Sequence, residues 1–146
     1  MAANPEGVVR CIKQALDNAN TLPDEIDLIS GHLTATGADK MEVQYWVNAL
    51  GRSGDKFPLI NFVKGMIGHC LSAAGSIETV AVVLQIINQF VHPNINLEDP
   101  NPEIVQLIGT KAMPVKKVNK EIIIVAKSNF GFGDVNACLI LSKYKN

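Results

Sequence analysis

Apolar positions recur at two different spacings along the chain, and the spacing predicts which segments are helices and which are strands. Between residues 5 and 19 they recur every three or four positions, the period of a helical stripe. Asn4-Pro5 marks the start of this helix, because Asn caps helices and Pro fits the first helical position. A second helix is expected over residues 39–50 and is closed by Gly51. A long third helix is expected over about residues 68–90, with small residues in its first two turns that permit close approach of another backbone.

Short apolar runs between these helices predict strands. The runs at 26–29 and 58–63 each follow a predicted helix, and the second would be buried on both faces. The runs at 121–127 and 135–143 are joined by a glycine-containing turn at 129–134, which is typical of a hairpin. Strands that alternate with helices indicate a layered α/β domain. We expect a mixed sheet of about five strands that closes in the C-terminal hairpin.

Composition narrows the classes of protein. The chain has 146 residues, 47% of them apolar and 18% charged, which indicates one folded domain. A net charge of −1 gives no support for nucleic-acid binding. The three cysteines have no metal-site spacing and are expected to be reduced thiols. The N-terminus does not resemble a secretory signal, and the longest apolar stretch, 79–87, is shorter than the roughly 20 residues of a membrane span. A cytoplasmic protein is expected.

Candidate chemistry lies where three of the predicted strands end. The loops at 31–37 and 64–69 directly follow two strands, and the turn at 129–134 follows a third. Ligands of open α/β sheets collect at the carboxyl ends of the strands. If the sheet brings these ends together, two histidines, a lysine, two threonines and an aromatic turn converge there.

Four motifs are similar to motifs of the β-ketoacyl-acyl-carrier-protein synthases. His32-Leu-Thr34-Ala-Thr36 resembles the family's His-Gly-Thr-x-Thr. The segment from Lys64 to Gly75, which contains His69, resembles Lys-x-x-x-Gly-His-x-Leu-Gly-Ala-Ala-Gly, with Glu78 at the family's glutamate position. Ser128-Asn-Phe-Gly-Phe-Gly133 resembles the Phe-Gly-Phe-Gly turn, and Pro93-Asn-Ile-Asn96 matches a Pro-x-Ile-Asn segment. The motifs occur in family order over most of the chain, so it is identified as a member of this family.

The resemblance implies a thiolase-like fold, in which two similar α/β halves pack together. Residues 1–146 correspond to the C-terminal ketosynthase half. The family's nucleophilic cysteine lies in the N-terminal half, which is absent from this sequence. Cys11, Cys70 and Cys138 are therefore interpreted as core or pocket-wall residues.

The resemblance also implies the catalytic roles. His32 and His69 would donate hydrogen bonds to the carbonyl oxygen of a malonyl thioester, which becomes negative as carbon dioxide leaves. His69 is expected at the start of the long helix, where the helix dipole favours a neutral ring. Lys64 belongs to the same catalytic set and is expected to form an ion pair beneath the site with the supporting Glu78.

The substrate contacts follow from the same comparison. Thr34 and Thr36 resemble the family's contacts to the phosphopantetheine arm, and Phe130 and Phe132 would line the acyl pocket, with Phe132 as its gate. No metal and no bound cofactor are expected, because the family's substrates are carried on the phosphopantetheine of acyl carrier protein. The implied partners are acyl carrier protein, the N-terminal half and, in the complete protein, a second copy.

The chain departs from the family pattern at several positions. Leu33, Ser72 and Asp134 stand where glycines are usual, and the proline that normally follows the second threonine is missing. Both histidines are intact. We interpret the chain as a divergent branch whose acyl specificity is open.

Three functional interpretations are weighed. The first is a 3-oxoacyl-acyl-carrier-protein synthase of fatty acid or polyketide biosynthesis, an acyltransferase that performs decarboxylative Claisen condensation, of which this fragment alone is inactive. The second is a non-catalytic partner subunit similar to a chain-length factor, against which the intact His32, Lys64 and His69 argue. A thiolase is weaker, because the turn at 129–133 contains no cysteine.

Overall fold

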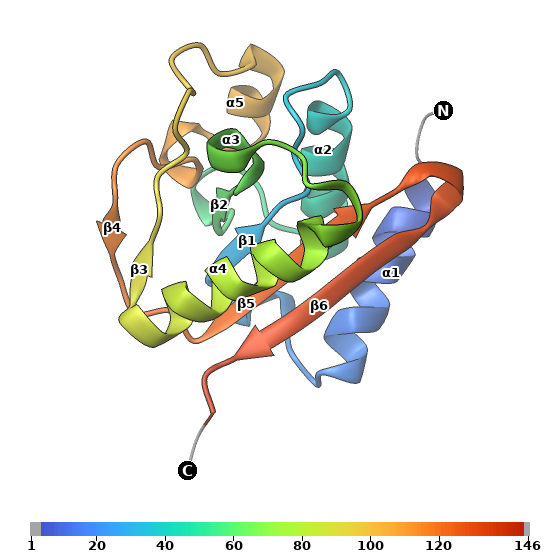
Figure 1. Cartoon of the computed structure of the whole chain (residues 1–146). Coiled ribbons are helices and arrows are strands. Elements are labelled where there is room, and N and C mark those ends of the chain that lie inside the picture. Colours follow the sequence, from blue (N-terminus) through green and yellow to red (C-terminus); the bar gives the residue numbers. More distant parts are fainter. Residues whose placement is uncertain (1–3, 145–146) are drawn as a thin grey trace.

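A computed structural model describes residues 4–144 and contains a mixed sheet of four strands in the order β2-β1-β5-β6 (Figure 1). β1 (Leu28–Ser30) pairs in parallel with both β2 (Leu59–Asn61) and β5 (Ile124–Phe130). β6 (Asn136–Ser142) runs antiparallel to β5 and forms the predicted C-terminal hairpin. The layered α/β class and the mixed sheet are confirmed, although the main sheet has four strands instead of about five.

A second, small sheet lies beside the first. It consists of β3 (Phe90–Val91) and β4 (Val118–Asn119), which pair antiparallel. The sequence did not predict either strand, because two residues are too few to show an alternating pattern.

Helices cover both faces of the main sheet (Figure 1). On one face, α1 (Pro5–Asn18), α2 (Asp39–Leu50) and α5 (Pro102–Ile108) pack with the strands in the larger core cluster. On the other face, α4 (Ala74–Asn88) packs in a smaller cluster. Adjacent strand residues belong to different clusters, as Leu28 and Ile29 do, because successive side chains of a strand point to opposite faces. The central strands are therefore buried on both faces.

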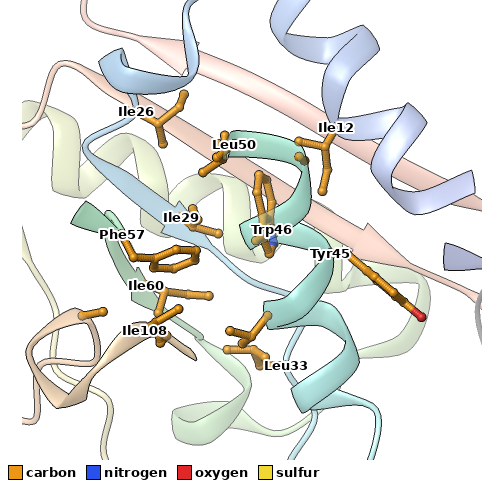
Figure 2. Close-up of a cluster of buried hydrophobic side chains, with 14 of the residues drawn as sticks. Ile12, Ile26, Ile29, Leu33, Tyr45, Trp46, Leu50, Phe57, Ile60 and Ile108 are labelled. Atoms are coloured by element: carbon orange, nitrogen blue, oxygen red, sulfur yellow. The ribbon is translucent and has the colours of Figure 1, made fainter. Parts of the chain in front are cut away.

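Trp46 of α2 is the largest fully buried side chain and lies in the middle of the larger cluster (Figure 2). Side chains from α1, from the sheet and from α5 surround it. Those labelled in the figure include Ile12, Ile29, Ile60 and Ile108. This packing fixes α2 against the sheet, and with it the loop that joins β1 to α2.

The predicted start of the first helix and the predicted end of the second are confirmed. The side chain of Asn4 accepts a hydrogen bond from the backbone N–H of Glu6 at 3.2 Å, and Gly51 ends α2 with a φ of 65°. The sequence did not predict α5, which begins at Pro102. Asn101 caps this helix at 2.9 Å with the same Asn-Pro signature, which could have revealed it.

The predicted long helix begins later than expected. The segment before it, Lys64–Ile67, forms the short helix α3. Leu71–Ala73 form a 3-10 turn, and α4 starts only at Ala74. Gly68 and Leu71 have φ angles of 74° and 49°, which a continuous right-handed helix does not allow. Four further 3-10 turns lie at Pro23–Glu25, Gly54–Lys56, Thr110–Ala112 and Phe132–Asp134.

One face of α4 is apolar and exposed. Its outward side chains are between 39% and 67% exposed and are Ile77, Val80, Val83, Leu84 and Ile87. By length and composition alone, Leu71–Asn88 could cross a membrane, with a mean hydropathy of 1.4 and 28% of the segment buried. The opposite face carries Glu78 and Gln85, both 1% exposed, and packs on the sheet. Within this fold α4 is a layer of the domain, and none of residues 4–144 covers its outer face.

Candidate active site

Three loops leave the carboxyl ends of β1, β2 and β5 at one edge of the sheet. These strands are parallel neighbours, so their ends meet there. The ring centroids of His32 and His69 are 5.3 Å apart, with the ring planes at 80°. The ring of Phe130 lies 6.3 Å from that of His32. The predicted convergence of the three strand ends is confirmed.

A buried carboxylate of α2 anchors the loop that carries His32. Glu42 accepts the backbone N–H of His32 at 2.7 Å with one oxygen and that of Leu33 at 2.9 Å with the other. The hydroxyl of Ser128 donates to Glu42 at 3.3 Å and joins the β5 end to the same acid. These contacts fix the backbone at His32 and therefore the position of its ring.

The sequence interpretation missed Glu42, although a signal was present. Glu42 lies four residues before Trp46 and so on the buried stripe of α2, where an acid needs partners. Burial raises the pKa of Glu42 to about 7, and the N–H groups of His32 and Leu33 oppose that rise.

The two threonines lie together on the loop after His32. Their hydroxyl oxygens are 3.1 Å apart, and Asp39 at the start of α2 accepts the N–H groups of Thr34 and Ala35 at 2.9 and 3.0 Å. Thr36 is exposed, and Thr34 is partly buried. The loop is thus held in a defined shape that presents hydroxyl groups at the surface beside His32.

A buried group of three charges lies beneath the histidines. Glu78 of α4 forms an ion pair with Lys64, which confirms the pairing that the resemblance implied. The other oxygen of Glu78 pairs at 2.6 Å with Lys127 of β5. The side chains of all three residues are at most 5% exposed. Because buried charges must be paired, Glu78 holds the two lysines in place.

Lys127 was not among the predicted site residues. It lies within an apolar strand and is 1% exposed, and the signal for it was a single lysine at the end of the run Ile122–Ala126. Burial lowers the pKa of Lys127, and Glu78 opposes this.

Asn129 connects the charged group to His32. Its side-chain oxygen accepts a hydrogen bond from Lys127 at 2.8 Å, and its nitrogen donates to Glu78 at 3.0 Å. The same nitrogen lies 3.4 Å from Nδ1 of His32. A side chain at Gly75 would place its Cβ 3.3 Å from the oxygen of Asn129, so this glycine lets α4 approach the end of β5.

The electrostatic environment keeps His32 neutral. Burial is the main cause that lowers the pKa of His32 to about 4. The nearby ammonium groups of Lys64 and Lys127 act in the same direction, whereas Glu78 opposes them. A ring that is neutral near pH 7 carries one N–H and can donate it to a developing negative charge.

His69 does not lie at the start of the long helix, as the sequence predicted. It lies between α3 and the turn at Leu71–Ala73, five residues before α4 begins. Its ring therefore does not lie at the N-terminal end of α4. The backbone N–H of Leu71 donates to its Nδ1 at 3.0 Å, which places the ring proton on Nε2. His69 is exposed.

Of the two phenylalanines in the turn at 129–134, only Phe130 lies near the histidines. Phe130 lies beside His32, but Phe132 is 92% exposed and packs against little of the described chain. Asp134, where the family has glycine, has a φ of 61°, a conformation that Asp tolerates better than most residues. Its carboxylate accepts the N–H of Asn4 at 2.8 Å and ties the turn to α1.

Two surface hollows lie away from the histidines. A polar hollow of about 470 Å³ is lined by Arg52 and Lys120, and an apolar one of about 390 Å³ by Met113 and Val115, and neither includes His32 or His69. Among residues 4–144, no group of three or more His, Cys, Asp or Glu side chains could hold a metal ion.

Comparison with known proteins identifies the family. The family model described as beta-ketoacyl synthase, C-terminal domain, matches residues 1–98. The chain is 40% identical over 141 residues to the chloroplastic 3-oxoacyl-[acyl-carrier-protein] synthase II of Arabidopsis thaliana, a match that covers 95% of the chain and 25% of that protein.

Two solved structures are similar in fold. The ishigamide ketosynthase/chain length factor matches with a TM-score of 0.89 and 34% identity over 99% of this chain and 34% of that one. AntDE:AntF, a type II acyl-carrier protein in complex with its ketosynthase bound to a hexaketide, matches with a TM-score of 0.82 and 29% identity over 98% and 35%. The chain thus spans about a quarter to a third of the length of these relatives.

Proposed function

The chain belongs to the family of beta-ketoacyl synthase C-terminal domains, and we propose that it is the C-terminal half of a 3-oxoacyl-acyl-carrier-protein synthase. The observation that carries the proposal is the pair His32 and His69, 5.3 Å apart above the buried Lys64–Glu78–Lys127 group. The reaction is decarboxylative Claisen condensation of a malonyl thioester with an acyl group.

Two imidazole donors suit the decarboxylation step. When the carbon–carbon bond to the malonyl carboxylate breaks, carbon dioxide leaves and the electron pair moves toward the thioester oxygen. Donors placed in advance around that oxygen stabilise the enolate. His32 stays neutral because its pKa is lowered to about 4, and His69 presents Nε2–H because Leu71 occupies Nδ1. The enolate carbon then attacks the acyl thioester on the cysteine of the other half and expels its thiolate.

Thr34, Thr36, Phe130 and Phe132 form the substrate-binding part of the proposal. The paired hydroxyls of Thr34 and Thr36 lie on the His32 loop, where a phosphopantetheine arm that reaches the histidines would pass. Phe132 is 92% exposed and free to line an acyl pocket completed by a partner. Acyl carrier protein as substrate carrier agrees with the names of the relatives, one of which is a ketosynthase in complex with such a carrier.

The N-terminal half is the proposed partner of the exposed apolar surface of α4. This surface consists of five exposed apolar side chains on the same helix as Glu78, and contiguous exposed apolar side chains are typical of an interaction site. On β6, the last strand of the described sheet, Leu139 is also 52% exposed. A half that covers α4 would close the open side of the site and bring its cysteine to the histidines. In the complete protein we propose a homodimer of such units.

The proposal is tested with the isolated chain. Purified chain, mixed with acyl- and malonyl-acyl carrier protein, is expected to form no 3-oxoacyl product, because the cysteine that would hold the acyl group is proposed to lie in the other half. Addition of the complementary half is expected to give product. Turnover by the chain alone, under conditions in which an Asn48→Ala control is equally soluble and folded, would contradict the proposal.

A second function is a non-catalytic partner subunit, which the match to a ketosynthase/chain length factor favours. Affinity capture from the native host distinguishes the two. Recovery of a separate ketosynthase with its own cysteine and both histidines supports the partner subunit. Recovery of an N-terminal half that lacks these histidines supports the first proposal.

The pathway and the compartment are proposed only in outline. One similar structure is named as part of a type II polyketide synthase, and we propose that the chain serves either polyketide or fatty acid synthesis. We propose a cytoplasmic site of action, although the Arabidopsis relative is named as chloroplastic.

A further inference from the structure

We propose that Lys127 is a positioning residue for His32, because it fixes the side-chain amide of Asn129 and thereby holds the His32 ring in the tautomer protonated on Nε2. The inference deepens the proposed function, since the use of that N–H as a donor to the thioester oxygen rests on it. The tautomer itself does not depend on whether the chain catalyses condensation.

Lys127 has a full set of acceptors around its ammonium group. Its Nζ lies 2.6 Å from Glu78 Oε2 and 2.8 Å from Asn129 Oδ1, and it also donates to the carbonyl oxygen of Ser128. A lysine ammonium has three hydrogens and accepts no hydrogen bond, so each of these neighbours must present an oxygen. The side chain is 1% exposed, and no solvent competes for these positions.

The side chain of Asn129 is therefore oriented from two sides. Its oxygen faces the ammonium of Lys127, and its nitrogen faces the carboxylate of Glu78 at 3.0 Å. A flipped amide would place N–H against an ammonium and oxygen against a carboxylate. Both contacts would be repulsive, so one orientation is strongly preferred.

The orientation of Asn129 determines the proton on His32. The amide nitrogen has two hydrogens, one for Glu78 and one that points toward His32 Nδ1 at 3.4 Å. Nδ1 must then accept, and a neutral ring keeps its single proton on Nε2. His69 reaches the same tautomer by another route, through the backbone N–H of Leu71. Both rings thus present Nε2–H.

Lys127 contributes what Glu78 cannot supply alone. Glu78 orients only the nitrogen side of the amide and is shared with Lys64, whose Nζ pairs with the other carboxylate oxygen. Without Lys127, the oxygen of Asn129 loses its charged donor, and the flipped amide can present oxygen to Nδ1 of His32. The Nδ1–H tautomer then becomes accessible.

The test is the tautomer ratio of His32, measured by long-range proton–nitrogen NMR on the full chain labelled with 15N-histidine at pH 7. The wild type is expected to show Nε2–H over Nδ1–H by about ten-fold or more, which corresponds to about 1.4 kcal/mol. In Lys127→Met the ratio is expected to fall by about five-fold or more, as the loss of one charge-assisted hydrogen bond implies. Lys127→Arg, which keeps the charge and the donors, restores part of the ratio.

Two controls separate this role from a general loss of structure. The exposed Lys120→Met should leave the His32 ratio unchanged, and the His69 signal should stay Nε2–H in every folded variant. If Lys127→Met does not fold, Asn129→Asp replaces it. An aspartate offers only oxygens to Nδ1, so the His32 proton should move to Nδ1. A wild-type His32 protonated on Nδ1, or an unchanged ratio in a folded Lys127→Met or Asn129→Asp variant, overturns the inference. Neither result depends on condensation activity, so failure of the proposed function is recognised separately.

Discussion

The balance of charges around Glu78 decides which groups of the site are ionised. One buried carboxylate faces the ammonium groups of Lys64 and Lys127, so the buried group carries an excess of positive charge. That excess acts on His32, whose pKa is lowered first by burial and then by these neighbours. Glu78 therefore keeps the lysines buried, and the lysines help to keep His32 neutral.

Glu78→Gln is expected to destabilise the chain by about 3–5 kcal/mol, because it leaves two buried ammonium groups without a counter-charge. Urea unfolding measures the loss. The exposed Glu121→Gln is the matched control and should change stability by no more than about 0.5 kcal/mol. Removal of one stranded cation, in the double variant Glu78→Gln with Lys127→Met, should recover part of the loss. A cost of less than about 1 kcal/mol for the single variant would contradict the role assigned to Glu78.

The lowered pKa of His32 makes the stability of the chain depend on pH in a known direction. Its pKa falls from 6.5 to about 4 on folding, so between these values the unfolded chain binds more protons than the folded chain. The stability that the neutral ring contributes is present above pH 6.5 and is lost as the pH falls toward 4. NMR titration should show His32 still neutral at pH 5.

Comparison with a variant isolates this contribution. Glu42, whose pKa is raised to about 7, changes stability in the opposite direction over the same window. The free energy of unfolding in urea is therefore measured for the wild type and for His32→Gln at pH 7 and at pH 5. When the pH falls from 7 to 5, the wild type should lose more stability than His32→Gln. Titration of His32 near pH 6.5 would show that the site does not desolvate the ring.

Motif residues of the site could be read from the sequence, and the residues that support them could not. His32, Lys64, His69 and Glu78 came from motif resemblance, and the structure brings them together. Glu42 and Lys127 lie outside those motifs, on a helix and a strand of mostly apolar residues. Their burial depends on how α2 and β5 pack in three dimensions, which local spacing does not encode.

At the outer edge of β2, the side chain of Asn94 makes the backbone hydrogen bonds that a neighbouring strand would otherwise make. Asn94 donates to the carbonyl of Ile60 at 3.0 Å and accepts the N–H of Phe62 at 3.2 Å. Its own N–H donates to Pro114 at 2.7 Å. Asn94 is 1% exposed, so it satisfies the sheet edge next to the loop that carries Lys64 and His69.

Asn94→Ala is expected to cost about 2–3 kcal/mol, because it leaves backbone groups of β2 without partners in a place that water does not reach. The control Asn48→Ala removes an exposed side-chain bond to Gln44 on α2 and should stay within about 0.5 kcal/mol. Thermal and urea unfolding compare the two. Equal stability of both variants would show that Asn94 does not hold the edge.

The elements differ in how well the sequence predicts them. α1 and α2 were predicted closely because a cap marks one end of each: Asn4 at the start of α1 and Gly51 at the end of α2. The start of α4 was placed about six residues too early, since the break depends on backbone angles at Gly68 and Leu71 that composition does not reveal. The predicted strand ended at Lys127, but β5 extends to Phe130. The extension was missed because Ser128 and Asn129 are polar, and they join the strand by backbone pairing with β6.

At the scale of the whole molecule, the site is assembled but open. His32 follows β1, Lys64 and His69 lie on and directly after α3, Glu78 lies on α4, and Lys127 lies on β5. The outer apolar face of α4 and the side chain of Phe132 are exposed. This arrangement fits a domain that supplies the enolate-stabilising half of a condensing enzyme and receives the acyl group from another half.

The central claim is that His32 and His69 stabilise the enolate while the acyl-holding cysteine comes from elsewhere. The most direct measurement replaces the matching region of the Arabidopsis synthase II, 40% identical over 141 residues, with this chain, and follows two steps of the chimera separately. We predict that the chimera becomes acylated and condenses with malonyl-acyl carrier protein. Its His32→Ala and His69→Ala variants should still be acylated, but should lose condensation by about 100-fold or more. Condensation at the unaltered rate in either folded variant, or a folded and acylated chimera that never condenses with both histidines intact, would contradict the claim.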